Sequence, residues 1–248
     1  MLGITTSGVN IENIQLALEL EKNNITNIDC AITNLVSKKW EHISVNDIHK
    51  LSEEYKRSSI GFNSIQSVFY GKSLDFNNSQ HHKQIVEHMK TICKYGSILN
   101  CRKVLFGSPR QRKDTGSREN FIKIFKTIDS IMSDNGFIFN IENLERCPDI
   151  LLQRPVEIIS FINEHNLKSC KLNLHLFVED QGVEDSLLKH NLLDTIHLSN
   201  YEYTDKILLQ QLPLLKRALS KIQDHPSVKI VEFQTNNTLQ MLKKISNM

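Results

Sequence analysis

The feature that most limits the possible folds is a regular alternation of short apolar segments with longer amphipathic ones along the whole chain. The short segments have the length of buried strands, and the longer ones carry apolar residues near helical spacing. Eight such pairs fit within 248 residues, the usual size of a (β/α)8 barrel. We therefore predict an α/β fold with eight parallel strands in one closed barrel. The predicted strands are residues 3–6, 29–32, 61–65, 104–107, 138–142, 172–176, 195–199 and 230–234, and the predicted helices are residues 10–24, 44–58, 80–99, 117–135, 154–166, 182–191, 204–222 and 237–247.

A doubly wound open sheet is the main alternative for such an alternating pattern. That fold usually has fewer strands and a glycine-rich first turn that binds a dinucleotide. The first turn here, TTSGVN, contains one glycine and no GxGxxG motif. Glycine and proline are scarce, at 9 and 5 residues, and no stretch has the composition of a linker. The sequence therefore predicts a single domain that spans residues 1–248.

Composition and charge exclude several classes of function. A formal net charge of +2 gives no strong field that would attract nucleic acid or an anionic membrane. No apolar run approaches 18 residues, and the first ten residues lack the basic and apolar regions of a secretory signal. Five cysteines without a CxxC pair favour free thiols in a reducing compartment. We expect a cytoplasmic protein that binds neither nucleic acid nor a membrane.

Candidate functional residues lie at the ends of the last four predicted strands. Chemistry in a barrel of this kind gathers at the carboxyl ends of the strands. Those ends carry Glu142, His175, His197 and Glu232, each of which has a metal-ligating side chain. A lone histidine in a strand is usually structural, but four such residues at consecutive strand ends favour a site. Two carboxylates and two imidazoles suit a divalent cation such as Mn²⁺, Zn²⁺, Co²⁺ or Fe²⁺.

Several segments of the sequence match motifs of a known family. The segments IGFNSIQSVFYGK, KVLFGSPRQR, IENLE, DTIHLSN and KIVEFQ occur in order along the chain. With them the chain resembles the xylose isomerase-like TIM barrels, and within these the sugar phosphate isomerase/epimerase group, in the superfamily that includes the apurinic endonucleases of family 2. One position departs from the family pattern, because His175 stands where the family usually has an aspartate. A histidine there removes one negative charge and softens the site.

The resemblance implies an isomerase or epimerase that moves a proton through an enediolate of a sugar or sugar phosphate. Glu142 and Glu232 would be both metal ligands and the acid/base pair, and His175 and His197 would complete the ligand set. Arg110 and Arg112, just past the fourth strand, could hold a phosphate or carboxylate of the substrate, although such charged loops are usually only solvated. Further polar residues expected at the same mouth to bind substrate hydroxyls are Gln66, Ser108 and Asn143.

Two other functions stay open on the sequence alone. An apurinic endonuclease-like phosphodiesterase shares this barrel, but it needs three metals and histidine ligands on earlier strands, where this chain has Gln66 and Ser108. A barrel without catalysis or metal, acting as a binding or scaffold protein, is kept open by His175. Retention of two carboxylates, which are costly to bury, argues against that reading. The partner we expect is a small-molecule sugar, and a homo-oligomer is not excluded.

Overall fold

The computed structural model describes residues 2–6, 13–177, 185–199, 212–222 and 224–232. Its eight parallel strands close into a barrel in chain order, and β1 pairs with both β2 and β8. The predicted fold class, a TIM barrel, is confirmed. The strands are β1 (Leu2–Thr5), β2 (Asn27–Cys30), β3 (Gly61–Ile65), β4 (Lys103–Phe106), β5 (Ile138–Glu142), β6 (Cys170–Phe177), β7 (Leu193–Ser199) and β8 (Val228–Val231).

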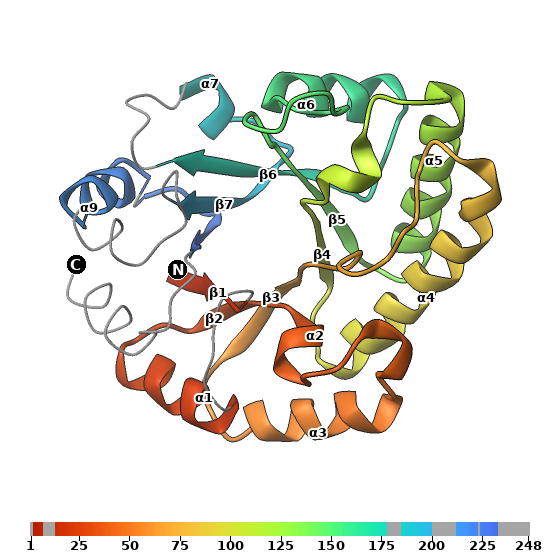
Figure 1. The fold of residues 1–248 in the computed structure, drawn as a ribbon. Helices are drawn as coiled ribbons and strands as arrows, with labels where there is room; N and C mark the ends of the chain where they lie inside the picture. The colour runs from red at the N-terminus through yellow and green to blue at the C-terminus, as the bar shows by residue number, and fades with distance from the viewer. Residues whose placement is uncertain (1, 7–12, 178–184, 200–211, 223, 233–248) are drawn as a thin grey trace.

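Helices surround the barrel and cover the outer surface of its strands (Figure 1). Each predicted helix that lies within the described ranges is present, with ends that differ by a few residues. The α-helices are α1 (Asn13–Lys22), α2 (Ile32–Leu35), α3 (Val45–Tyr55), α4 (His82–Ile98), α5 (Arg118–Asp134), α6 (Pro155–Glu164), α7 (Asp185–Leu188) and α9 (Leu212–Lys221), and the 3-10 helices are η1 (Trp40–His42), η2 (Ser79–His81) and η3 (Pro109–Arg112).

Local chemistry explains where several helices begin. The side chain of Ser44 accepts a hydrogen bond from the backbone N–H of Asp47, and the Asp47 carboxylate accepts one from the backbone N–H of Ser44, so α3 starts with a capping box. Ser117 caps α5 by accepting from the backbone N–H of Asn120. Pro155 occupies the first turn of α6, where its missing N–H costs no helical bond. These features explain where α3, α5 and α6 begin.

The second strand differs from its prediction. The strand predicted at residues 29–32 ends at Cys30, two residues earlier than predicted, and Ala31 directly precedes the short helix α2. The strand spans Asn27–Cys30, so Asp29 lies within it and is completely buried. The apolar run that continues to Ile32 gave no sign of this early end, because a short buried helix and a buried strand have the same apolar composition.

A cluster of phenylalanine rings packs behind the strands that lead to the site. Phe106 of β4 stacks on Phe139 of β5 with ring centroids 5.3 Å apart and on Phe76 at 5.0 Å. Phe125 of α5 contacts all three rings at 5.6 to 5.9 Å. All four side chains are fully buried, and each contributes roughly 1.5–3 kcal/mol by leaving water. Phe106 of β4 and Phe139 of β5 are thus packed against each other and against the α5 side chain of Phe125.

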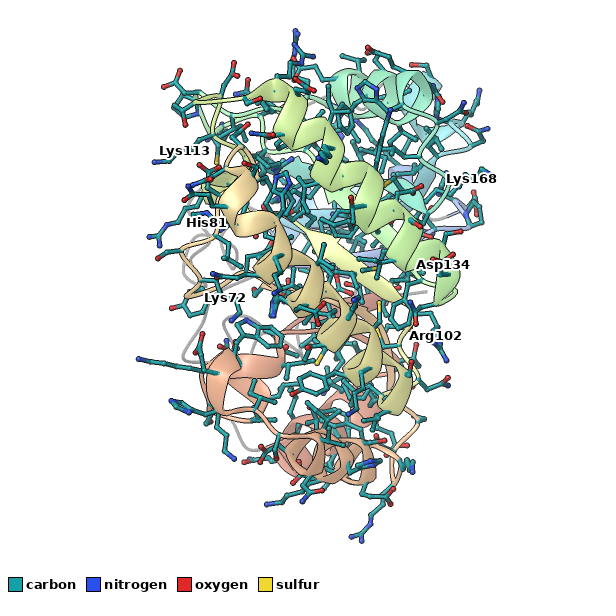
Figure 2. The ribbon with its side chains drawn as sticks, turned by 90° about the vertical axis from the view of Figure 1, so that its right-hand side faces the viewer. Lys72, His81, Arg102, Lys113, Asp134 and Lys168 are labelled. Atoms are coloured by element: carbon teal, nitrogen blue, oxygen red, sulfur yellow. The ribbon has the colours of Figure 1, made fainter. Side chains whose placement is uncertain are left out.

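The two ends of the barrel are chemically distinct. At the end where strands begin, the ammonium of Lys103 on β4 binds both carboxylate oxygens of Asp194 on β7, at 2.9 and 2.7 Å. Asn140 of β5 also donates to Asp194, at 2.8 Å. Figure 2 shows residues of the two ends on opposite sides of the molecule. Lys72, His81 and Lys113 lie at the end where the strands finish, and Arg102, Asp134 and Lys168 lie at the end where the strands begin.

Other sequence expectations have mixed outcomes. All five cysteines are free thiols, as predicted. The predicted helix at 237–247, the first part of the predicted helix at 204–222 and the last residues of the predicted strand at 230–234 lie outside the described residues. Within the described ranges, no helix combines the length and the apolar character needed to cross a membrane.

Candidate metal centre at the barrel mouth

Four consecutive strands bring the predicted ligands to one end of the barrel. Glu142 is the last residue of β5, and Glu232 directly follows β8. His175 of β6 and His197 of β7 are register partners in the parallel ladder, so both reach the same level of the barrel. Parallel strands in a closed barrel end at one face, and for that reason residues far apart in sequence meet there.

The side chains of these residues converge. One ligand atom from each of Glu142, His175 and Glu232 lies within 4.8 Å of the other two. Nδ1 of His175 is 3.5 Å from Oε1 of Glu142, and its Nε2 is 3.9 Å from Oε2 of Glu232. Nδ1 of His197 is 3.2 Å from Oε1 of Glu142 and 3.9 Å from Oε2 of Glu232. Each imidazole therefore has a nitrogen within 3.9 Å of each glutamate, but the ligand atoms that all lie within 4.8 Å of one another include one from His175 and none from His197.

A fifth titratable group, Asp29 of β2, contacts this cluster through His197. Its Oδ2 lies 2.7 Å from Nε2 of His197, and its Oδ1 accepts a hydrogen bond of 2.7 Å from the Asn63 side chain on β3. Both Asp29 and His197 are completely buried. Within the described part of the chain, Nδ1 of His197 makes no hydrogen bond of good geometry. One nitrogen of His197 is thus taken by Asp29, and the other is aimed at the two glutamates.

Burial and mutual charge shift the pKa values in opposite directions. Burial lowers the pKa of His175 to about 4, so this imidazole is neutral near pH 7. Burial would also lower the pKa of His197, but its contacts with Asp29 and Glu142 outweigh burial and raise that pKa well above its ordinary value. Burial and the negative charge of Glu142 raise the pKa of Glu232 to about 7. For Glu142, burial is outweighed by His197 and His175, and the pKa is lowered.

The donor set fits a divalent cation. Ligand atoms of two glutamate carboxylates and of the neutral His175 imidazole lie within 4.8 Å of one another. Nδ1 of His197, which is buried and lacks a good hydrogen bond, lies 3.2 Å from one of these carboxylates. Mixed oxygen and nitrogen donors of this kind suit Mn²⁺, Zn²⁺, Co²⁺ or Fe²⁺. A cation would also reduce the repulsion between Glu142 and Glu232 that otherwise raises the pKa of Glu232.

Glu142 is held closely by its neighbours. Asn173 of β6 donates to Oε1 of Glu142 at 3.2 Å. Gly107 lies against the other oxygen, since a Cβ on Gly107 would overlap Oε2 of Glu142. The guanidinium of Arg112 donates to the main-chain carbonyls of Glu142 at 2.9 Å and Leu152 at 3.1 Å. These contacts fix both the side chain and the backbone of Glu142 before any ligand binds.

The two arginines predicted to grip an anion lie in different environments. Arg110 is exposed at the surface of η3. Arg112, by contrast, is completely buried, with its guanidinium 5.5 Å from the centre of the Phe106 ring. Burial lowers the pKa of Arg112 to about 10, which leaves it charged at neutral pH. Arg112 thus supports Glu142 from behind, while Arg110 faces solvent.

The polar residues predicted to bind substrate hydroxyls are largely occupied by protein contacts. The side-chain amide of Gln66 donates to Oγ1 of Thr5 and to the carbonyl of Asp29. Asn143 is 3% exposed, and its amide both accepts from the backbone N–H of His175 at 2.6 Å and donates to its carbonyl at 3.0 Å. Ser108 is half-buried at the start of η3 and does not cap it.

Sequence reasoning missed Asp29 although a signal was present. A carboxylate within an apolar strand is costly to bury unless a partner pairs with it, and this argument applies to Asp29 as it does to Glu142. Because the second strand was predicted to end beyond Asp29, that residue was not read as facing the site. Asn173 and Gly107 were not predicted to hold Glu142 in place, since an amide and a glycine have no chemistry that marks them for that role.

Comparison with solved structures identifies the same barrel in several proteins. An AP endonuclease of family 2 from Brucella melitensis matches with a TM-score of 0.74 and 12% identity over 99% of this chain and 98% of that chain. A 3-keto-D-glucoside 4-epimerase from E. coli matches with a TM-score of 0.71 and 13% identity over 99% and 97%. The IOLI protein, solved with a zinc atom, matches with a TM-score of 0.66 and 14% identity over 99% and 96%.

By contrast, no protein-family model and no curated protein matches the chain in sequence. At 12–14% identity the structural matches speak for the fold and not for the activity. Their near-complete coverage of both chains shows that the whole barrel is shared. The chain therefore has the xylose isomerase-like TIM barrel fold, which sugar epimerases and AP endonucleases of family 2 have in common.

Proposed function

We propose that the chain is a metal-dependent isomerase or epimerase that acts on a sugar or sugar phosphate. The observation that carries this proposal is the buried group of Glu142, His175 and Glu232, whose ligand atoms lie within 4.8 Å of one another at the carboxyl end of the barrel. Solved sugar epimerases of this fold, including D-psicose and L-ribulose 3-epimerases, support the substrate class.

The ligands in this proposal are Glu142, His175, His197 and Glu232. A bound divalent cation supplies Lewis acidity that polarises a substrate carbonyl and stabilises negative charge on its oxygen. Neutral His175 keeps a lone pair for coordination, because burial holds its pKa near 4. His197 is oriented toward the two carboxylates by its bond to Asp29.

Glu142 and Glu232 are the acid/base pair in this proposal. One carboxylate removes the proton from the carbon next to the carbonyl, and the other returns a proton to the enediolate. The two groups have pKa values moved in opposite directions, lowered for Glu142 and raised for Glu232, as expected of a pair with different protonation roles. Arg110 remains the candidate for holding an anionic group of the substrate, because it is exposed on a loop at this face.

The endonuclease reading has weaker support. It requires more metal ligands at the ends of the earlier strands. Gln66, which follows β3, is engaged with Thr5 and with the backbone of Asp29, and β4 is followed by Gly107 and Ser108. The epimerase reading needs one cation, for which the described ligands suffice.

Two measurements test the proposal together. Calorimetric titration of the purified protein with Mn²⁺, Zn²⁺ and Co²⁺ should detect one site, and Glu142→Gln should weaken it. Incubation with a panel of ketoses and their phosphates in D₂O should place deuterium on the carbon next to the carbonyl, as read by NMR. Glu164→Gln, on the exposed surface of α6, is the matched control and should change neither result. A wild-type protein that takes up no divalent metal would overturn the proposal.

A further inference from the structure

The second strand contributes a carboxylate that has no place in the ligand set. Asp29 is completely buried, and its Oδ2 is 2.7 Å from Nε2 of His197 across the inside of the barrel. The two residues are separated by 168 positions in the sequence. A buried carboxylate is costly unless it is paired and hydrogen-bonded, and His197 is one of the partners that Asp29 has here.

Asp29 cannot turn away from His197. Its other oxygen accepts a hydrogen bond of 2.7 Å from the amide of Asn63 on β3. Its main-chain carbonyl accepts from the backbone N–H and the hydroxyl of Thr6, both at 3.0 Å, and from Gln66 at 3.3 Å. Both the backbone and the carboxylate plane of Asp29 are thus fixed by neighbouring strands.

This arrangement decides which nitrogen of His197 faces the site. An ionised carboxylate only accepts hydrogen bonds, so Nε2 of His197 must carry a proton to donate to Asp29. The nitrogen left to bind a cation is then Nδ1, which lies 3.2 Å from Glu142 and 3.9 Å from Glu232 and gives up any proton it carries when the cation binds. Histidine ligands in metal sites are oriented by such partners, which are worth about 10- to 100-fold in metal affinity.

We propose that Asp29 is a positioning residue that, through its bond to Nε2 of His197, presents Nδ1 to the cation at the barrel mouth. This inference rests on the proposed function insofar as it assumes that the site binds a cation. Asn63 takes part by fixing which oxygen of Asp29 meets the imidazole. A carboxylate that merely stabilised the barrel would lower stability when changed, but it would not control the proton on His197.

The test is Asp29→Asn, which keeps the shape of the side chain. Because Asn63 still donates to the oxygen, the new amide NH₂ would face Nε2 of His197, which must then accept. The proton would move to Nδ1 and oppose coordination. We expect the affinity for Zn²⁺, measured by calorimetry, to fall 10- to 100-fold. Nitrogen NMR of ¹⁵N-histidine-labelled metal-free protein should show Nε2 of His197 protonated in the wild type and unprotonated in the variant.

Asp194→Asn is the matched control, since it makes the same chemical change at the opposite end of the barrel, where Asp194 binds Lys103. It should leave both the Zn²⁺ affinity and the His197 spectrum unchanged. A folded Asp29→Asn protein that binds Zn²⁺ within twofold of the wild type, or that keeps Nε2 of His197 protonated, would overturn the inference.

The proton on His197 can also be measured in the wild type alone and in metal-free protein. If circular dichroism shows that Asp29→Asn does not fold, the wild-type spectrum decides, because an unprotonated Nε2 on His197 contradicts the proposed bond and a protonated one supports it. A wild-type protein that binds no Zn²⁺ would refute the proposed function, whereas the comparison of the His197 proton between wild type and variant would still decide the role of Asp29.

Discussion

Replacing Gly107 with alanine is the sharpest test of how the site is built. A Cβ at this position would overlap Oε2 of Glu142 and would lie 3.2 Å from its Cδ. Nonbonded carbon atoms are most stable at about 3.5–4.0 Å, so the carboxylate must move by on the order of 1 Å. Moving a catalytic group by about 1 Å costs roughly 100-fold in rate. The energetic cost to the fold is about 1–3 kcal/mol if the carboxylate cannot give way and less if it swings toward the open mouth.

The assay pairs metal titration with deuterium exchange. We expect Gly107→Ala to bind Mn²⁺ or Zn²⁺ about 10- to 100-fold more weakly and to lose most proton exchange, while its circular dichroism spectrum stays that of the wild type. Gly61→Ala is the matched control at the exposed start of β3, where the nearest atom to the added Cβ is 3.7 Å away. Wild-type metal affinity in Gly107→Ala would refute the claim that this glycine sets the position of Glu142.

Three further predictions follow from contacts elsewhere in the chain. Lys103→Met leaves the half-buried Asp194 carboxylate with fewer partners and should lower the free energy of unfolding by about 2 kcal/mol in urea titrations; an unchanged value would show that the pair contributes little. Burial lowers the pKa of His88 from 6.5 to about 4, so the unfolded chain binds a proton there more readily, and the contribution of His88 to stability should fall by about 2 kcal/mol between pH 7 and pH 5; His88→Gln should lack this share of the pH dependence, and a variant with the same pH dependence as the wild type would contradict this. Arg110→Ala should raise KM at least tenfold for an anionic substrate with little change in stability, whereas Arg112→Ala should destabilise the fold because Arg112 is buried and bonds two carbonyls; equal stability of the two variants would refute the distinction.

The number and order of the strands were predictable because each is encoded locally. A buried strand needs a short apolar run, and the helix that follows needs one apolar face, so both leave a period in the sequence. The same locality allowed a helix to be predicted from residue 44, because the capping box of Ser44 and Asp47 spans only four residues. Where the local signal was ambiguous, as at Ala31, the prediction was wrong.

The candidate ligands were predictable for a related reason. In a parallel barrel every strand ends at the same face, so a residue's place along its own strand already indicates the face on which it lies. Glu142 and His175 could therefore be paired in advance, and the structure brings their side chains to 3.5 Å. Arg112 shows the limit of this reasoning, because its place just past the fourth strand suggested a contact with substrate, whereas the fold buries its side chain against Phe106.

The sequence by itself determined an eight-stranded barrel and a row of metal-ligating side chains at four strand ends, because periodicity and strand polarity are properties of short segments. Only the tertiary structure decided what holds those side chains in place. The bond from Asp29 to His197 and the contact of Gly107 with Glu142 join different strands. Such contacts depend on how the closed barrel staggers its strands, and no local spacing in the sequence encodes that stagger.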